Sequence, residues 1–471
     1  MKKWLLIFLS AILFLTGCAG RNPPPDGTTP SDPPSTEQPD TPDTPDTPDT
    51  PEPEEPTYSV AFDSADYAVG AGASAQTSIT LTNAENATYV SSAPSVVSVS
   101  ESGVITGIVL GSATVTVNAV AKNESKDKLS ATCEVFVNPA SYETLDGDEP
   151  TVKWLGRTFT AAGAVNCYNT ASGFEAGFYG TRFSARIVAA GNKTPQVCVL
   201  VDGETSPTAK IVDLTKNKAT ATYVLAENLE EGAHTIRVCK LTEPFTTSLG
   251  FVSLETDGYF LNRPKDRALK LEVYGDSITV GHKNMRTTAE EPDDSADKIQ
   301  NGCMTYAWLA AEKVNAELNV MARTGIGIYS AWGNPFILKN NWNKTYLSET
   351  DFLATGAGNP AWDFDLYVPD VVIVNIGTND YWYQRNETLY KKEMKAFCEN
   401  LFEKYGSETK IVLAGGMMIT DNISAMKSVA KEFTAGNVTV VKLPISAANH
   451  PRVADNRAAA TALAKHIESI V

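Results

Sequence analysis

The sequence predicts a multidomain protein in which two all-β sandwich domains precede an α/β domain with a parallel sheet. Between residues 58 and 265, short segments of alternating polar and apolar residues are separated by turn residues, which is typical of β-sandwiches. From residue 269 onward, apolar strand segments alternate with helix-period segments, which is typical of a parallel sheet covered by helices on both faces. A length of 471 residues is consistent with about three such domains.

The N-terminus predicts an export signal. Two lysines precede the apolar run Trp4–Leu15, which is too short to span a bilayer as a helix. The run leads into Leu15-Thr16-Gly17-Cys18, which resembles the lipobox of bacterial lipoproteins. This resemblance implies cleavage after residues 1–17, lipidation of the Cys18 thiol, and anchoring to the cell envelope, in the outer membrane or at the cell surface. The alternative is an ordinary signal peptide that happens to contain a cysteine.

Residues 18–57 predict a tether. Residues 21–57 hold thirteen of the 26 prolines, ten acidic residues and one basic residue, and repeat Asp-Thr-Pro four times. Proline and like charges favour an extended spacer with a reach on the order of 100 Å; a low-complexity tail of no selected length is the alternative. The tether carries about half of the net charge of −17. This acidic chain offers no basic patch for phosphates, which excludes a general nucleic-acid binder.

Residues 58–139 predict the first β domain. Its strand-like segments are Ser78–Thr82, Val96–Val99, Thr114–Ala119 and Cys133–Val137. The stretch from Ser95 to Val117 resembles bacterial Ig-like domains of group 2. The resemblance implies a spacer module, with glycan or surface binding as the alternative.

Residues 140–265 predict the second β domain, because they contain further strand-like segments and no helix-period segment. The predicted strands are Phe183–Ala189, Gln196–Val201, Ala219–Val224 and His234–Lys240. The pair Asp202-Gly203 is a hairpin-turn signal. This pattern favours a jelly-roll β-sandwich.

Residues 266–471 predict the α/β domain. The predicted strands are Leu269–Tyr274, Leu318–Ala322, Val371–Ile376, Lys410–Ala414 and Val438–Lys442. The predicted helices are Thr305–Glu317, Leu389–Lys404, Ser424–Phe433 and Asp455–Ile470. Parallel sheets carry their functional residues at the carboxyl ends of the strands. We therefore expect a site in the loops that follow the first three strands and the last one.

Those four loops carry residue types suited to ester hydrolysis. Ser277 lies on a tight turn after the first strand, where its hydroxyl becomes a nucleophile once a base removes the proton. Gly325 permits close approach of the backbone to a ligand, and the Asn379 amide can donate to a developing oxyanion. His450 is the candidate general base, whereas His282 is less suitably placed. Each residue alone has an ordinary explanation as a cap or turn residue.

Taken together, the four loops resemble the consensus blocks of SGNH (GDSL-type) hydrolases over Lys270–Val471. Two motifs and the preceding β domain resemble carbohydrate esterase family 2 in particular. The motifs are Trp362-Asp363-Phe364 and Gly377-Thr378-Asn379-Asp380, and the β domain runs from Gly156 to His234. The resemblance implies a carboxylic ester hydrolase of the acetyl xylan esterase type. Such an enzyme removes acetyl groups from plant cell-wall polysaccharides such as xylan and mannan, without a metal or organic cofactor.

The same resemblance implies a role for each loop residue. Ser277 would be the nucleophile, and His450 would be the general base that later protonates the leaving sugar hydroxyl. The oxyanion hole would consist of the backbone N–H groups of Ser277 and Gly325 together with the side chain of Asn379.

One departure from the family pattern concerns the catalytic acid. The family places an aspartate two or three residues before the histidine, whereas these positions are Ala448 and Ala447 here, and neither Ser446 nor Asn449 carries a charge. Three interpretations follow. The enzyme uses a Ser–His dyad in which a backbone carbonyl orients His450, a carboxylate from elsewhere in the chain replaces the aspartate, or the domain is catalytically impaired and only binds its ligand. The dyad is favoured because both reacting residues and every oxyanion donor are present.

Aromatic residues near the second and third loops indicate a carbohydrate ligand. Trp332 and Trp382 are predicted to line the cleft and stack on sugar rings, and Trp362 is predicted to pack in the core. We therefore expect an acetylated polysaccharide or oligosaccharide as the substrate. We expect the protein itself to be a monomer. No two cysteines form a C-x-x-C pair, so no metal site is predicted.

Two other functions stay open on the sequence. The Ig-like region and the missing aspartate would suit a carbohydrate-binding or adhesion lipoprotein with an impaired esterase domain. The SGNH blocks would also suit an esterase that acts on lipids or small esters, although long acyl chains require an apolar groove.

Overall fold

The computed structural model describes residues 55–288, 290, 296–333, 335–349, 354–447 and 449–471. The chain divides into two units, residues 1–55 and 56–471, and the second is described here. The signal peptide, Cys18 and residues 18–54 of the tether lie outside the described residues, so these features stay predictions. Among the helices of the described residues, none is both long and apolar enough to cross a membrane.

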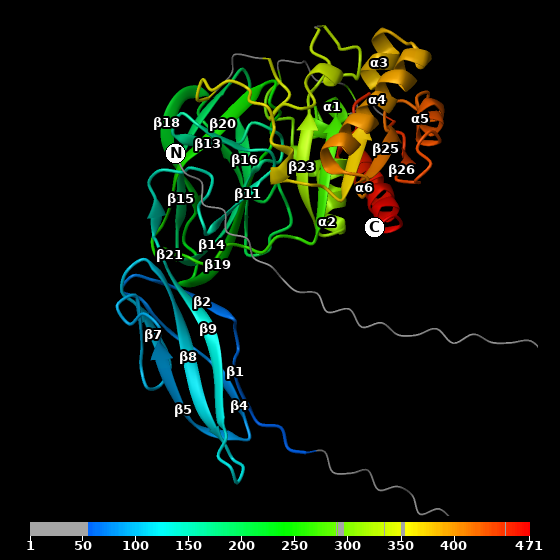
Figure 1. Ribbon diagram of the computed structural model, residues 1–471. Coiled ribbons are helices and arrows are strands. Elements are labelled where there is room, and N and C mark those ends of the chain that lie inside the picture. The colour runs from blue at the N-terminus through cyan, green and yellow to red at the C-terminus, as the bar shows by residue number, and fades with distance from the viewer. Residues whose placement is uncertain (1–54, 289, 291–295, 334, 350–353, 448) are drawn as a thin grey trace, which may run out of the picture. The chain divides into compact units, whose positions relative to one another are not determined.

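The first β region forms three small sheets (Figure 1). Their strand orders are β2-β9-β8-β5, β3-β7-β6 and β1-β4. The strands are β1 (Ser59–Phe62), β2 (Asp66–Gly70), β3 (Ser74–Gln76), β4 (Ile79–Thr82), β5 (Ala84–Ser91), β6 (Val97–Val99), β7 (Val104–Gly107), β8 (Gly111–Ala121) and β9 (Lys128–Asn138). Alternate residues of β8 are buried, because successive side chains of a strand point to opposite faces.

The second β region forms two larger, mainly antiparallel sheets. One has the order β12-β13-β20-β15-β18 with β10 paired to β20, and the other has the order β11-β14-β19-β16-β17 with β21 paired to β14. The strands are β10 (Ser141–Tyr142), β11 (Val152–Leu155), β12 (Phe159–Ala161), β13 (Ala164–Asn166), β14 (Gly173–Gly180), β15 (Phe183–Gly191), β16 (Gln196–Val201), β17 (Ile211–Asp213), β18 (Asn217–Ala226), β19 (Gly232–Lys240), β20 (Thr247–Thr256) and β21 (Tyr259–Phe260).

These two sheets share one apolar core. Phe174 and Phe178 of β14 pack with Phe183 of β15 and Phe251 of β20, and all four side chains are buried. The sheets therefore pack face to face. At the predicted hairpin turn, Asp202 and Gly203 both have positive φ angles, but the next strand begins only at Ile211, so the connection is longer than a tight hairpin.

The α/β region contains a parallel sheet of order β23-β22-β24-β25-β26. Its strands are β22 (Leu269–Gly275), β23 (Ala316–Ala322), β24 (Val371–Asn375), β25 (Lys410–Gly416) and β26 (Val438–Leu443). All five predicted strands are confirmed, with ends that differ by one or two residues. They are recognisable because buried parallel strands are apolar on both faces.

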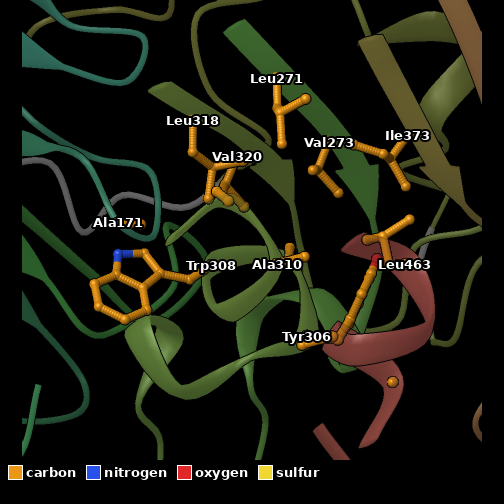
Figure 2. Packing of buried hydrophobic residues seen from close by; sticks show 14 of the residues in the cluster. Ala171, Leu271, Val273, Tyr306, Trp308, Ala310, Leu318, Val320, Ile373 and Leu463 are labelled. Carbon is orange, nitrogen blue, oxygen red and sulfur yellow. The ribbon is translucent and has the colours of Figure 1, made fainter. Parts of the chain in front are cut away.

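Helices cover both faces of this sheet (Figure 1). The α-helices are α1 (Ser277–Val280), α2 (Tyr306–Lys313), α3 (Thr378–Tyr383), α4 (Glu387–Tyr405), α5 (Ile423–Ala430) and α6 (Val453–Glu468), and the short 3₁₀ helices are η1 (Gly302–Met304), η2 (Leu338–Asn340) and η3 (Phe364–Leu366). Helices α2 and α6 pack on one face, and α4 and α5 pack on the other. In Figure 2, Tyr306, Ala310 and Leu463 of the helices face Val273 and Ile373 of the strands.

The prediction of one helix, Thr305–Glu317, was wrong at its C-terminal end. Helix α2 stops at Lys313, and Ala316 already begins β23. Asn315 adopts a φ of 49°, the left-handed conformation that ends helices and that asparagine tolerates. The apolar residues at the start of β23 continue the helical pattern by chance. Periodicity alone could therefore not locate the end of the helix.

Candidate active site

The four predicted loops meet at the carboxyl end of the parallel sheet and line one cavity of about 440 Å³. The cavity contains all of the site residues predicted within the α/β domain: Ser277, Gly325, Trp332, Asn379, Trp382 and His450. Only the predicted lipidation residue, Cys18, lies outside the described residues.

The turn after β22 presents Ser277 to the cavity. Asp276 caps α1 by accepting a hydrogen bond from the Ile278 N–H at 3.0 Å. Gly275 is required here, because a Cβ at this position would lie 1.9 Å from Thr279 Oγ1. Ser277 is the first residue of α1, so its N–H has no acceptor within the helix and can bind a ligand.

His450 is placed to accept the proton of Ser277. Its Nε2 lies 3.1 Å from Ser277 Oγ, which is hydrogen-bonding distance. The His450 carbonyl accepts a hydrogen bond from Arg286, which fixes the main chain of the loop. The ring of His282 packs edge-on against the His450 ring with centroids 4.8 Å apart. His282 also lines the cavity, but the contact with Ser277 Oγ belongs to His450.

The loop that carries Gly325 is held by α3. Asp380 accepts hydrogen bonds from three consecutive backbone N–H groups, those of Ile328, Tyr329 and Ser330, at 2.9–3.0 Å. Asn379 Nδ2 donates to the Ile326 carbonyl at 2.8 Å. The motif after β24 therefore fixes the neighbouring loop in place.

Three hydrogen-bond donors are available to a ligand beside Ser277. No other described residue accepts a hydrogen bond from the Gly325 N–H, and the Ser277 N–H, at the start of α1, is also available. An amide group carries two donor hydrogens, and Asn379 uses one of them on Ile326. Such a set can stabilise the negative oxygen of a tetrahedral intermediate next to an activated serine.

Two buried aspartates lie in the loops that line the cavity. Burial raises the pKa of Asp276 to about 7, and the nearby charge of Asp380 adds to that rise. Burial also raises the pKa of Asp380 to about 6, against the opposing effect of its three backbone hydrogen bonds. The next acid after His450 in the chain, Asp455, accepts hydrogen bonds from Ser446 Oγ and the Arg452 N–H at the start of α6.

The three tryptophans singled out in the sequence differ in their exposure to solvent. Trp332 and Trp382 are about half exposed and line the cavity. Trp362 is 9% exposed and lies 5.1 Å from the guanidinium of the buried Arg157.

Residues of the second β region also line the cavity, and the sequence motifs did not reveal them. They are Asn192, Lys193, Gln196, Thr242, Glu243, Phe245 and Thr246. Glu243 accepts hydrogen bonds from both the N–H and the hydroxyl of Thr324, at 2.8 and 2.9 Å. It follows β19 without any recognisable motif, so only its position in space marks it as part of the site.

A cluster of cysteines lies apart from the cavity lining. The Sγ atoms of Cys198, Cys239 and Cys303 lie within 4.8 Å of one another and are buried. Burial contributes to the raised pKa of the Cys303 thiol. The spacing in the sequence could not show this cluster, since two of its members come from β16 and β19 and the third from η1.

Comparison with known proteins agrees with this architecture. Residues 154–264 match the family described as carbohydrate esterase 2 N-terminal. The cellulase/esterase CelE of Acetivibrio thermocellus is 32% identical over 245 residues, which cover 51% of this chain and 28% of that protein. An acetylxylan esterase / glucomannan deacetylase of Cellvibrio japonicus is 29% identical over 185 residues, which cover 38% of this chain and 48% of that protein. The chain thus spans less than half of the length of either relative.

Solved structures give the same result for the fold. A family two carbohydrate esterase from Clostridium thermocellum, in complex with cellohexaose, matches with a TM-score of 0.60 and 26% identity, and the match covers 68% of this chain and 98% of that one. The sheets and the SGNH-like α/β domain described above correspond to this architecture. The family match, the sequence relatives and the fold thus agree in their similarity to the family 2 carbohydrate esterases.

Proposed function

We propose that the cavity is the active site of a serine esterase that removes acetyl groups from acetylated xylan or mannan. The observation that carries this proposal is the 3.1 Å contact between Ser277 Oγ and His450 Nε2, in a cavity that Gly325 and Asn379 also line. The names of the relatives, an acetylxylan esterase / glucomannan deacetylase among them, support the choice of an acetylated polysaccharide.

The first half of the reaction transfers the acetyl group to the enzyme. His450 Nε2 takes the proton of Ser277 Oγ, and the oxygen attacks the acetyl carbonyl carbon. The N–H groups of Ser277 and Gly325 and the Asn379 amide stabilise the resulting oxyanion. When the intermediate collapses, His450 gives its proton to the leaving sugar oxygen, and acetyl-Ser277 remains.

The second half releases acetate. His450 now takes a proton from a water molecule, and the hydroxide attacks the acetyl carbonyl carbon of acetyl-Ser277. The same three donors stabilise the second oxyanion. Collapse of this intermediate returns the proton to Ser277 Oγ and frees acetate.

The proposed catalytic unit is a Ser–His dyad. A triad would need a carboxylate, and the candidates in α3 and in the first turn of α6 are Asp380 and Asp455. Both oxygens of Asp380 accept hydrogen bonds from the Gly325 loop, and Asp455 binds residues at the start of α6. These contacts support the dyad over the recruitment of either of these two acids.

Acetate release from a panel of acetylated polysaccharides tests the activity. Wild type is expected to release acetate from xylan or mannan, and Ser277→Ala and His450→Ala are expected to lose at least about 10³-fold in kcat. Ser428→Ala, an exposed serine on α5, is the matched control and should match wild type. Unchanged acetate release by Ser277→Ala would overturn the proposal.

The same samples separate the two other functions. A carbohydrate-binding protein with impaired catalysis would be retained on polysaccharide but would not hydrolyse p-nitrophenyl acetate. A lipid esterase would show rising kcat/KM with acyl chain length in a series of p-nitrophenyl esters. The polar and aromatic lining of the cavity leads us to expect the highest rate with acetyl.

We also propose that the enzyme is held at the cell envelope by a lipid on Cys18, with residues 18–57 as the spacer. The motif at residues 15–18 and the proline-rich composition support this. Cys18→Ser is expected to move the protein from the membrane fraction to the soluble fraction of expressing cells. Retention of that variant in the membrane fraction would contradict the anchor.

A further inference from the structure

We propose that Glu243, a residue of the second β region, is a positioning residue that fixes the Gly325 N–H in the oxyanion hole. This inference rests on the proposed function, because it assigns part of the catalytic geometry to a different domain.

The carboxylate of Glu243 holds the residue next to Gly325 by two hydrogen bonds. Oε2 accepts from the Thr324 N–H at 2.8 Å, and Oε1 accepts from the Thr324 hydroxyl at 2.9 Å. The Glu243 side chain is fully buried, and burying a charge is costly unless its oxygens are hydrogen-bonded. Thr324 and Gly325 share one peptide plane, so a fixed Thr324 limits the directions in which the Gly325 N–H can point.

The turn that carries Glu243 is itself well anchored. The Glu243 carbonyl accepts hydrogen bonds from the N–H groups of Thr246 and Thr247. Phe245 of the same turn packs on the guanidinium of Arg323, which lies 4.3 Å from its ring centroid. Two side chains of one turn in the second β region therefore contact the consecutive residues Arg323 and Thr324.

In the chain, Gly325 lies between the residues held by this turn and the residues held by α3. Asn379 binds the Ile326 carbonyl, and Asp380 binds the N–H groups that follow. Gly325 has a φ of 80°, in a region that glycine enters freely, and its carbonyl accepts a hydrogen bond from the Trp332 N–H at 2.8 Å, so its N–H depends on how the preceding residue is held. An oxyanion donor must be held in place before the reaction to be effective. Removal of the Glu243 contact would remove the two hydrogen bonds that hold Thr324, the residue directly before Gly325.

Glu243→Gln, Thr324→Val and the double variant test this role in the full chain. Gln keeps the size of the side chain but removes its charge, and its amide nitrogen can bind the Thr324 hydroxyl only as a donor, so at most one of the two acceptor contacts is kept. Rates are measured with p-nitrophenyl acetate and divided by the number of sites that a fluorophosphonate titrates, so misfolded protein does not count. We expect kcat to fall at least about tenfold and KM to change less than about twofold, since an oxyanion donor acts mainly on the transition state. In the double variant, the loss should be smaller than the product of the two single losses.

Glu227→Gln, at an exposed position of the same β region, is the matched control and should retain wild-type kcat and KM. A kcat of Glu243→Gln within twofold of wild type per titrated site would overturn the positioning role, whatever the change in melting temperature.

Amide hydrogen exchange gives a readout that needs no turnover. In Glu243→Gln, the peptide that covers residues 323–332 should exchange at least about tenfold faster than in wild type, and it should be unchanged in Glu227→Gln. Unaltered exchange in Glu243→Gln would overturn the inference even if wild type proved inactive. Inactive wild type with faster exchange in the variant would contradict only the proposed esterase function.

Discussion

Asn379 divides its amide between structure and the proposed chemistry. One hydrogen holds the Ile326 carbonyl at 2.8 Å, and the other is available to the oxyanion. Asn379→Ala is therefore expected to lower kcat on acetylated substrate by about 10²–10³-fold, with a much smaller effect on KM. Asn400→Ala on α4 is a control that should leave both constants unchanged. A decrease below about threefold in Asn379→Ala would show that the amide does not serve as an oxyanion donor.

The raised pKa of Asp276 leads us to expect that the stability of the protein depends on pH. Its pKa is raised to about 7 by burial, whereas a carboxyl in the unfolded chain titrates near about 4. Between these values the folded protein holds a proton that the unfolded chain has released, so this group makes the free energy of unfolding fall as the pH rises from about 4 to about 7. Asp276→Asn removes the titration.

We therefore expect the free energy of unfolding of Asp276→Asn, relative to wild type, to increase between pH 5 and pH 8. Urea denaturation at both pH values measures it. Asp365→Asn, at an exposed position, should show no such trend. A relative stability that is constant or falls with pH would contradict the raised pKa.

At the scale of elements, β22 is joined to the second β region by a buried ion pair. Arg157 follows β11, and its Nε donates to Glu272 Oε1 of β22 at 3.0 Å, while both side chains are fully buried. Arg157 Nη2 also donates to Tyr274 Oη, and Tyr405 Oη donates to Glu272 Oε2. The strand that precedes Ser277 is thus bound to the second β region near the middle of the strand.

Loss of one partner leaves a buried charge without compensation. Arg157→Met is expected to lower the free energy of unfolding by about 3–5 kcal/mol, measured by urea denaturation. The double variant Arg157→Met with Glu272→Leu should recover part of this loss. Arg385→Met, which breaks an exposed pair with Asp421, is the control and should cost less than about 1 kcal/mol. A similar small cost for Arg157→Met would show that the buried pair does not hold the two elements together.

Elements differed in how well the sequence predicted them. The parallel strand Val371–Asn375 was predicted to within one residue, because an unbroken apolar run has few alternatives. Strand β9 runs from Lys128 to Asn138, although only Cys133–Val137 was predicted. Its first half alternates exposed polar residues with partly buried ones, and such a segment becomes a strand only because β8 pairs with it along its length.

At the scale of the whole molecule, the second β region completes the core of the α/β domain. The cluster between the sheet and α2 and α6 includes side chains from that β region, namely Leu155, Ala171, Cys198, Leu200, Cys239 and Leu241. A chain of residues 266–471 alone would expose this surface. We expect it to aggregate or to lack a cooperative thermal transition by circular dichroism, and a cooperative transition would contradict this prediction.

A chain of residues 140–471 should behave differently, because none of residues 56–139 lines the cavity. We expect its kcat/KM on acetylated substrate to lie within about twofold of that of the full chain. A larger loss would show that the first β region, which resembles an Ig-like spacer in sequence, contributes to substrate binding.

The sequence by itself determined the features that a short stretch of chain encodes. Apolar runs and helical periodicity located the strands and most helices of the α/β domain, and the order of Ser277, Gly325, Asn379 and His450 after its strands indicated the site. Topology then brings these loops together, because the carboxyl ends of parallel strands lie at one edge of a sheet.

Only the tertiary structure decided which residues from elsewhere join them. Glu243 at the Gly325 loop, the Arg157–Glu272 pair and the cluster of Cys198, Cys239 and Cys303 each combine segments that are far apart in the chain. The physical reason is that burial and hydrogen bonding select partners by distance in space, and a single sequence carries no periodic or motif signal for such contacts.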